Sequence, residues 1–237
     1  MQPIPVTETV MRLPLLPPHR VNAYLVGGVL IDSGGRLGGR RLLRLLEGQR
    51  LSAHVLTHAH PDHQGCSRRV CQEFEIPLLC GEGDRAAAES GDQRSLMPRS
   101  GPLMVGLLNL MTGPGHPVDR TLCEGDEIGG LTVIEAPGHT PGHLAFWEER
   151  TRVLILGDVL FHMQPATLRT ALSEPFRFAT FDRAANLRSA RKLAALNPEA
   201  ICFGHGPPLT DGDAFQRFVA GLPRVSPASD RRGAPSP

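Results

Sequence analysis

The chain has 237 residues, of which 41% are hydrophobic, and this length suffices to bury the core of one mixed α/β domain. Its formal net charge is only +1, so the charge balance does not favour a nucleic acid as partner. The N-terminus lacks the basic and apolar regions of a secretory signal, and no apolar run approaches bilayer-spanning length. Five cysteines without a Cys-x-x-Cys pair fit a reducing compartment. We therefore expect a cytoplasmic protein that does not enter a membrane.

Apolar runs predict strands and helices in alternation along the chain. The first expected elements are strands at about Val21–Val26 and 29–32, followed by a helix near 37–47. The later ones are a strand over 53–57 with a helix opened by Gln64-Gly65, a strand over Leu131–Glu135, strands that end at 158 and 205, and helices over 181–196 and 213–222. After Pro223 the sequence is rich in Pro, Ser, Arg and Gly. We predict one domain over residues 1–222 and a mobile tail over 223–237.

Three histidines and an aspartate follow one of these strands within six residues, in the run His58-Ala59-His60-Pro61-Asp62-His63. Neutral imidazole and carboxylate oxygen are ligands that zinc and similar divalent ions prefer. A turn from strand to helix can project these side chains to one side. The spacing therefore indicates a metal site.

Three more predicted strands lead to residues of the same chemistry, namely His139, Asp158 and His205. In this order the four loops resemble the metallo-β-lactamase superfamily, whose pattern is His-x-His-x-Asp-His, then a His, an Asp and a final His. The resemblance spans roughly residues 20–210. It implies an α/β (α+β) fold, an αββα sandwich, with the metal site at one edge between two sheets.

The resemblance also assigns the ligands of two divalent metal ions. Five imidazoles and two carboxylates can hold two ions and leave each an open position for water or substrate. Zinc is the expected metal, and iron or manganese are the alternatives. The first ion takes His58, His60 and His139, the second takes Asp62, His63 and His205, and Asp158 bridges the two.

Two such ions lower the pKa of a bridging water toward neutrality, so a metal-bridging hydroxide can attack a carbonyl or phosphoryl centre. Asp62 is the expected catalytic residue, because its carboxylate can orient this water or pass a proton to the leaving group. We expect a dinuclear metal-dependent hydrolase of a small-molecule thioester, ester, lactone or phosphodiester. One alternative is a mononuclear iron oxidoreductase of the persulfide dioxygenase type, which has a similar ligand pattern, and metal content separates the two.

A second alternative is a thioesterase of the hydroxyacylglutathione hydrolase (glyoxalase II) type, since the run from Gly157 to Phe161 resembles the corresponding stretch of those enzymes. Two features depart from that type. Only 32 residues follow His205, which is too few for the helical glutathione-binding domain of those enzymes, and His162-Met163-Gln164-Pro165 replaces a Gly-Cys-Gly-type segment. The sequence therefore predicts poor activity on hydroxyacylglutathione thioesters.

Two segments without candidate metal ligands are expected to determine specificity. The segment 161–181 leaves the sheet directly after Asp158, so we expect it to line the mouth of the site, with His162 or Arg169 binding the substrate. The segment 91–117 is rich in leucine and methionine, which suits a lid, the face of a homodimer or ordinary core.

Overall fold

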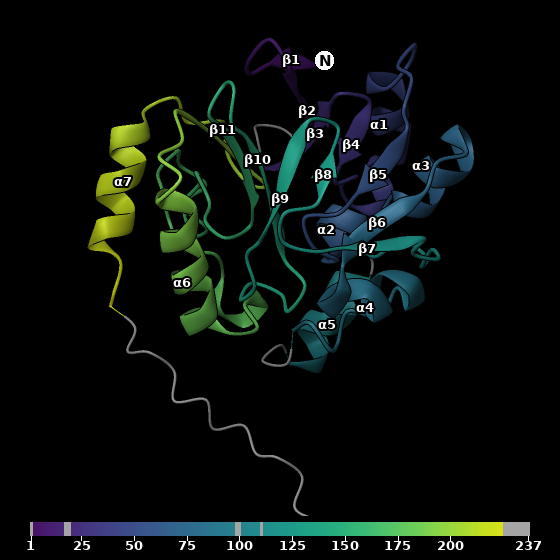
Figure 1. The fold of residues 1–237 in the computed structure, drawn as a ribbon. Helices are drawn as coiled ribbons and strands as arrows, with labels where there is room; N and C mark the ends of the chain where they lie inside the picture. The colour runs from purple at the N-terminus through teal and green to yellow at the C-terminus, as the bar shows by residue number, and fades with distance from the viewer. Residues whose placement is uncertain (1, 17–19, 98–100, 110, 225–237) are drawn as a thin grey trace, which may run out of the picture.

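The computed structural model describes residues 2–16, 20–97, 101–109 and 111–224. In these residues two β-sheets lie face to face, and helices cover the outer face of each sheet (Figure 1). This four-layer arrangement confirms the predicted αββα sandwich. Each layer buries one apolar face against the next, which is the arrangement that amphipathic helices and two-faced sheets require.

The first sheet contains seven strands among the described residues, and their spatial order follows the chain. The pairs from β1 to β4 are antiparallel and those from β4 to β7 are parallel. Parallel strands end at the same edge, and the run from His58 to His63 leaves the sheet there, after β5. The strands are β1 (Ile4–Pro5), β2 (Val10–Leu16), β3 (Val21–Val26), β4 (Val29–Ile31), β5 (Ala53–Val55), β6 (Leu78–Gly81) and β7 (Arg120–Leu122).

The second sheet has five strands within the described ranges, in the order β12-β11-β10-β9-β8. The pair β11 and β12 is parallel, whereas the other pairs are antiparallel. Asp158 and His205 therefore leave the same edge of this sheet, one after each parallel strand. The strands are β8 (Glu127–Ile128), β9 (Leu131–Glu135), β10 (Leu144–Glu148), β11 (Val153–Gly157) and β12 (Ala200–Phe203).

Helices on the outer face of each sheet form the outer layers (Figure 1). The first sheet is covered by α1 (Gly39–Leu45) and α3 (Ser67–Phe74), and the second by α6 (Arg183–Ala194) and α7 (Gly212–Gly221). The side chain of Asp182 caps α6 by accepting hydrogen bonds from two backbone amides of its first turn. The shorter helices are α2 (Pro61–Gln64), α4 (Arg85–Ser90) and α5 (Pro102–Asn109), and 3₁₀ turns cover Arg36–Gly38, Glu82–Asp84 and Arg177–Ala179.

A large apolar cluster lies between the two sheets. It joins Tyr24 and Ile31 of the first sheet to Val133, Phe146 and Ile155 of the second, and all five side chains are buried. Burying a large apolar side chain contributes about 1.5–3 kcal/mol to the free energy of folding. The rigid core thus fixes the strand ends from which the candidate ligands project.

The predicted strands are confirmed, but the helix after the first ligand motif begins earlier than expected. Gln64-Gly65 does not open it, because α2 starts at Pro61 and Gly65 is the residue after its end. Proline suits the first helical position, where its missing N–H costs no hydrogen bond. Asp62 and His63 therefore lie on a helical turn at the end of the motif.

In the described part of the chain, no helix combines the length and the apolar character needed to cross a membrane. Of the predicted tail, all residues after Arg224 lie outside the described residues. The segment 91–117 is described in part: Leu96 and Met97 are buried as core, whereas Leu103 on α5 is 89% exposed.

Candidate metal centre

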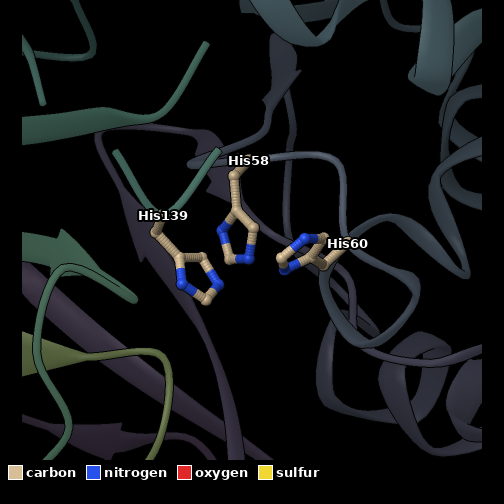
Figure 2. A group of neighbouring side chains, drawn as sticks. All are labelled: His58, His60 and His139. Atoms are coloured by element: carbon tan, nitrogen blue, oxygen red, sulfur yellow. The ribbon is translucent and has the colours of Figure 1, made fainter. Parts of the chain in front are cut away.

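Four loops bring histidine and aspartate side chains together where the two sheets meet. His58 and His60 come from the loop after β5, and His139 comes from the loop after β9. The three imidazoles face a common point (Figure 2), and one potential ligand atom from each lies within 4.8 Å of the others. We call these three residues the first cluster.

The second cluster consists of Asp62, His63 and His205, whose potential ligand atoms also lie within 4.8 Å of one another. The His205 Nε2 atom is 3.2 Å from Asp62 Oδ2. The residue before His205 must be glycine, because a Cβ atom at Gly204 would stand 2.1 Å from Asp158 Oδ1.

Asp158 lies between the two clusters. Its Oδ2 atom is 3.5–3.7 Å from the Nε2 atoms of His139 and His58, and 3.2–3.4 Å from those of His205 and His63. The structure thus brings all seven predicted ligands to one place. A carboxylate oxygen within this distance of four imidazole nitrogens is the arrangement expected of a ligand shared by two ions.

The imidazole nitrogen atoms that face the centre of the site make no hydrogen bond within the described residues. The Nε2 atoms of His58, His60, His63 and His139 and the Oδ1 atom of Asp158 are buried, and among the described residues none of them is hydrogen-bonded. Native proteins rarely bury polar atoms without partners. Lone pairs of neutral imidazoles around a carboxylate fit divalent cations, so the donor set is suited to the metals that the sequence predicts.

The outward nitrogen atoms, in contrast, are held by the protein. Nδ1 of His63 donates to Asp32 Oδ2 at 2.8 Å, and Nδ1 of His58 lies 3.0 Å from the hydroxyl of Thr57. Nδ1 of His205 donates to the carbonyl oxygen of Arg20. A donor hydrogen bond at Nδ1 leaves the lone pair on Nε2, which is how partners of metal-binding histidines select the required tautomer.

The pKa values of the two clusters shift in opposite directions. Burial lowers the pKa of His60 to about 4, and it also lowers the pKa values of His58 and His139. Burial opposes charge on His205 too, but Asp158 and Asp62 outweigh it and raise its pKa to about 10. Without metal, the histidines of the first cluster are therefore neutral at pH 7, whereas His205 holds a proton.

Asp32, which the sequence did not single out, supports the first ligand motif at both of its ends. This buried carboxylate accepts hydrogen bonds from the amide and the hydroxyl of Thr57 and from His63 Nδ1. Its φ of 60° lies in the left-handed region, which a non-glycine residue rarely adopts outside functional sites. The signal in the sequence was an acidic residue at the end of the apolar strand β4.

Two further residues position the ligand loops. Asp84 accepts hydrogen bonds from the Ala59 amide, the Thr140 hydroxyl and the Gly142 amide, and it thereby ties the loop of His58 to the loop of His139. The second is His143, whose Nε2 atom accepts a hydrogen bond from the Asp158 amide at 3.1 Å.

The residues predicted to bind substrate lie outside the two clusters. His162 is half-buried, and its Nδ1 atom donates to the carbonyl oxygen of Pro207 at 2.8 Å, whereas Arg169 is exposed. The segment 161–181 runs from Asp158 to the other side of the site, where the Phe181 amide donates to the His139 carbonyl. The substrate-binding roles of His162 and Arg169 stay predictions.

Comparisons with known proteins agree with this geometry. The family model described as "Metallo-beta-lactamase superfamily" matches residues 16–205. The chain is 29% identical to the probable metallo-hydrolase YflN of Bacillus subtilis (strain 168) over 210 residues, which cover 77% of this chain and 76% of that protein. It is 32% identical to the hydroxyacylglutathione hydrolase GloC of Haemophilus influenzae over 219 residues, 88% of this chain and 92% of the relative.

Among solved structures, that of TTHA1623 in a di-iron-bound form is similar, with a TM-score of 0.66 and 31% sequence identity. The match covers 83% of this chain and 92% of that one. The chain therefore belongs to the metallo-beta-lactamase superfamily and is a metallo-hydrolase of that fold. Its seven candidate ligands for divalent metals are the six residues of the two clusters together with Asp158.

Proposed function

We propose that the protein is a hydrolase that uses two divalent metal ions to cleave a small-molecule ester or thioester, with lactones and phosphodiesters as related substrates. The observation that carries this proposal is the position of Asp158 Oδ2 among four imidazoles that belong to two ligand clusters. His58, His60 and His139 would hold one ion, and Asp62, His63 and His205 the other. When bound, two such ions acidify a water molecule and polarise the scissile carbonyl group.

The side chains around the site have distinct tasks in this proposal. The carboxylate of Asp62 is half-buried, and His63 and His205 hold its pKa below the usual range although burial opposes this. It is therefore ionised at neutral pH and can accept a proton from the attacking water, then return it to the leaving group. Asp32 keeps the His63 ring in place, and Asp84 fixes the distance between the ligand loops.

Zinc is the metal that we propose first, because imidazole and carboxylate ligands suit it. Iron is the main alternative, since the similar structure of TTHA1623 is described as di-iron-bound. Manganese remains the third option. A cytoplasmic location and a possible homodimer stay predictions from the sequence.

A second candidate function is hydrolysis of a hydroxyacylglutathione thioester. The chain covers 92% of GloC of Haemophilus influenzae, a relative named as such a hydrolase. An appended glutathione-binding domain is therefore not a requirement for every protein with that name, and the length argument from the sequence is wrong. The replacement of the Gly-Cys-Gly-type segment by His162-Met163-Gln164-Pro165 still distinguishes this chain.

The test is a panel of substrates assayed with metal-loaded protein. Protein stripped with a chelator and reloaded with zinc, iron or manganese would be assayed on acyl thioesters, acyl esters, lactones, a phosphodiester and lactoylglutathione. We expect metal-dependent turnover of a thioester or ester above the other classes. Metal-dependent oxidation of glutathione persulfide without hydrolysis of any ester would instead support the mononuclear iron oxidoreductase.

A further inference from the structure

An apolar groove of about 240 Å³ opens on the surface beside the hairpin of β2 and β3. Two of its leucines are unusually open to solvent, because Leu16 is 46% exposed and Leu37 is 88% exposed. Of the described residues that line it, only Arg36 is charged. Exposed apolar surface of this kind commonly marks a binding site. The lining consists of Leu15, Leu16, Val21, Gly35, Arg36, Leu37, Gly38 and Met111.

One end of the groove lies beside the backbone of the second cluster. A Cβ atom at Gly35 would lie 3.9 Å from the Cα atom of Asp62 and 3.5 Å from Met111 Cε. On the opposite wall, Val21 directly follows Arg20, whose carbonyl oxygen accepts the hydrogen bond from His205. The groove therefore runs beside the backbone of Asp62 and beside the strand next to Arg20, whose carbonyl oxygen holds the His205 ring.

A backbone hydrogen bond between two lining residues fixes the shape of the groove. The Arg36 amide donates to the carbonyl oxygen of Met111 at 2.9 Å, which fixes the segment 91–117 against the turn after β4. Gly34 packs so tightly below it that a Cβ atom there would stand 2.6 Å from Leu15 Cδ1. A preformed groove costs a ligand little conformational entropy on binding.

We propose that this groove binds the aliphatic acyl chain of the substrate and places its carbonyl carbon at the metal centre. This inference rests on the proposed ester or thioester hydrolysis. The leucine, valine and methionine walls of the groove suit an alkyl chain. The segment 161–181, whose His162 amide donates to the His205 carbonyl, would offer His162 and Arg169 to a polar leaving group. The volume equals about eight water-sized groups at roughly 30 Å³ each, which suits a chain of about eight carbons.

The test varies the acyl chain at a constant leaving group. Zinc-loaded protein would be assayed on thioesters of N-acetylcysteamine from acetyl to dodecanoyl, and on acetyl thioesters of alkyl thiols of increasing length. We expect kcat/KM to rise by up to about fourfold for each methylene added to the acyl chain, and to level off near octanoyl. Lengthening the alkyl thiol should have a smaller effect.

Two variants and one control test whether the acyl chain of the substrate lies in the groove. Gly35 has an extended backbone with φ of −76°, so Gly35→Leu introduces no backbone strain and fills the end of the groove beside the second cluster. It should move the optimum to chains several carbons shorter at unchanged metal content, and Leu37→Asn should flatten the rise. Ile4 is 40% exposed on β1 outside the groove, so Ile4→Asn is the matched control and should keep the wild-type profile.

Each contrary outcome has its own meaning. Good hydrolysis with a flat acyl-chain profile, or a profile set by the thiol, overturns the acyl assignment and leaves the proposed function standing. If no ester or thioester is hydrolysed, the proposed function fails, and calorimetry with octanoate decides on the groove: binding that Gly35→Leu abolishes supports it, and any other result overturns it. A dimer that Leu37→Asn dissociates would assign the groove to a second copy of this chain and overturn the proposal.

Discussion

His143 holds Asp158 by its backbone: the Asp158 amide donates to His143 Nε2 at 3.1 Å, and the His143 ring is stacked on His58 at a centroid distance of 5.0 Å. The preceding residue must be glycine, because a Cβ atom at Gly157 would lie 2.8 Å from the same Nε2 atom. A histidine outside both clusters thus fixes Asp158, which lies between them.

His143→Phe tests this relationship, since it keeps an aromatic ring against His58 but removes the acceptor. The buried Asp158 amide is then left unpaired, which should lower the free energy of unfolding by about 1–3 kcal/mol. Metal affinity should fall about tenfold, as expected when a partner behind the ligands is lost. Urea unfolding and competition with a chelator measure the two effects, and His143→Gln should recover part of both. Wild-type metal affinity in His143→Phe would contradict the positioning role.

Asp62→Ala should remove most of kcat, because it deletes a ligand of the second cluster and the proposed proton acceptor. Its side chain is 23% exposed, so folding should change little. Asp213→Ala is the matched control, since Asp213 lies in the first turn of α7 as Asp62 lies in the first turn of α2. Steady-state kinetics on the best substrate provide the measurement. Activity of Asp62→Ala within about tenfold of wild type, or roughly 1.4 kcal/mol of barrier, would contradict the assigned role.

Asp32→Asn keeps the shape of the side chain but removes the charge behind His63. Metal affinity should fall by about 10–100-fold, because the carboxylate orients this histidine and raises its basicity. Asp84→Asn is the control, as its contacts are to Ala59, Thr140 and Gly142 and to no candidate ligand. Chelator competition on both variants makes the comparison. Equal losses in the two variants would show that general loosening of the loops, not the charge at Asp32, sets the affinity.

Metal loading of the two clusters should respond differently to pH. His60, with a pKa of about 4, and its neutral partners release no proton at pH 7, so affinity at the first cluster should be constant between about pH 6 and 8. His205 has a pKa of about 10 in the metal-free protein, and this proton must leave when metal binds. Affinity at the second cluster should therefore rise with pH over the same range, and the His205 proton alone contributes up to about tenfold per pH unit.

Calorimetric titration with metal in buffers of different ionisation enthalpy measures this proton release directly. We expect one binding step whose heat does not depend on the buffer and a second step whose heat does. Two steps with the same proton release would contradict the assignment of neutral histidines to one cluster and protonated ones to the other.

The candidate ligands could be predicted from the sequence because they follow apolar strands in a short, ordered motif. His58, His139, Asp158 and His205 each stand directly beyond a strand end, and the ends of neighbouring strands meet at one edge. The sandwich was implied by the resemblance of this ordered motif to the metallo-β-lactamase superfamily. Local sequence therefore specified both the elements and the residues that their ends present.

The supporting residues could not be predicted, because their roles depend on contacts between distant segments. Asp32 acts on Thr57 and His63, and Asp84 acts on Thr140, which is 56 residues away. The groove likewise joins the end of β2 and the turn after β4 to Met111. Periodicity reports which face of one element is buried, but it does not report which distant side chain lies against that face.

Hydrolysis at a site of two metal ions is tested by following activity during metal titration. Stripped protein would be titrated with zinc or manganese while turnover of the best thioester or ester is followed, and bound metal would be counted by elemental analysis. We expect turnover to rise until two equivalents of metal are bound, and to fall when Asp158→Ala removes the shared ligand. Full hydrolytic activity at one bound equivalent, or oxygen-dependent chemistry with a single iron, would contradict hydrolysis by two metal ions.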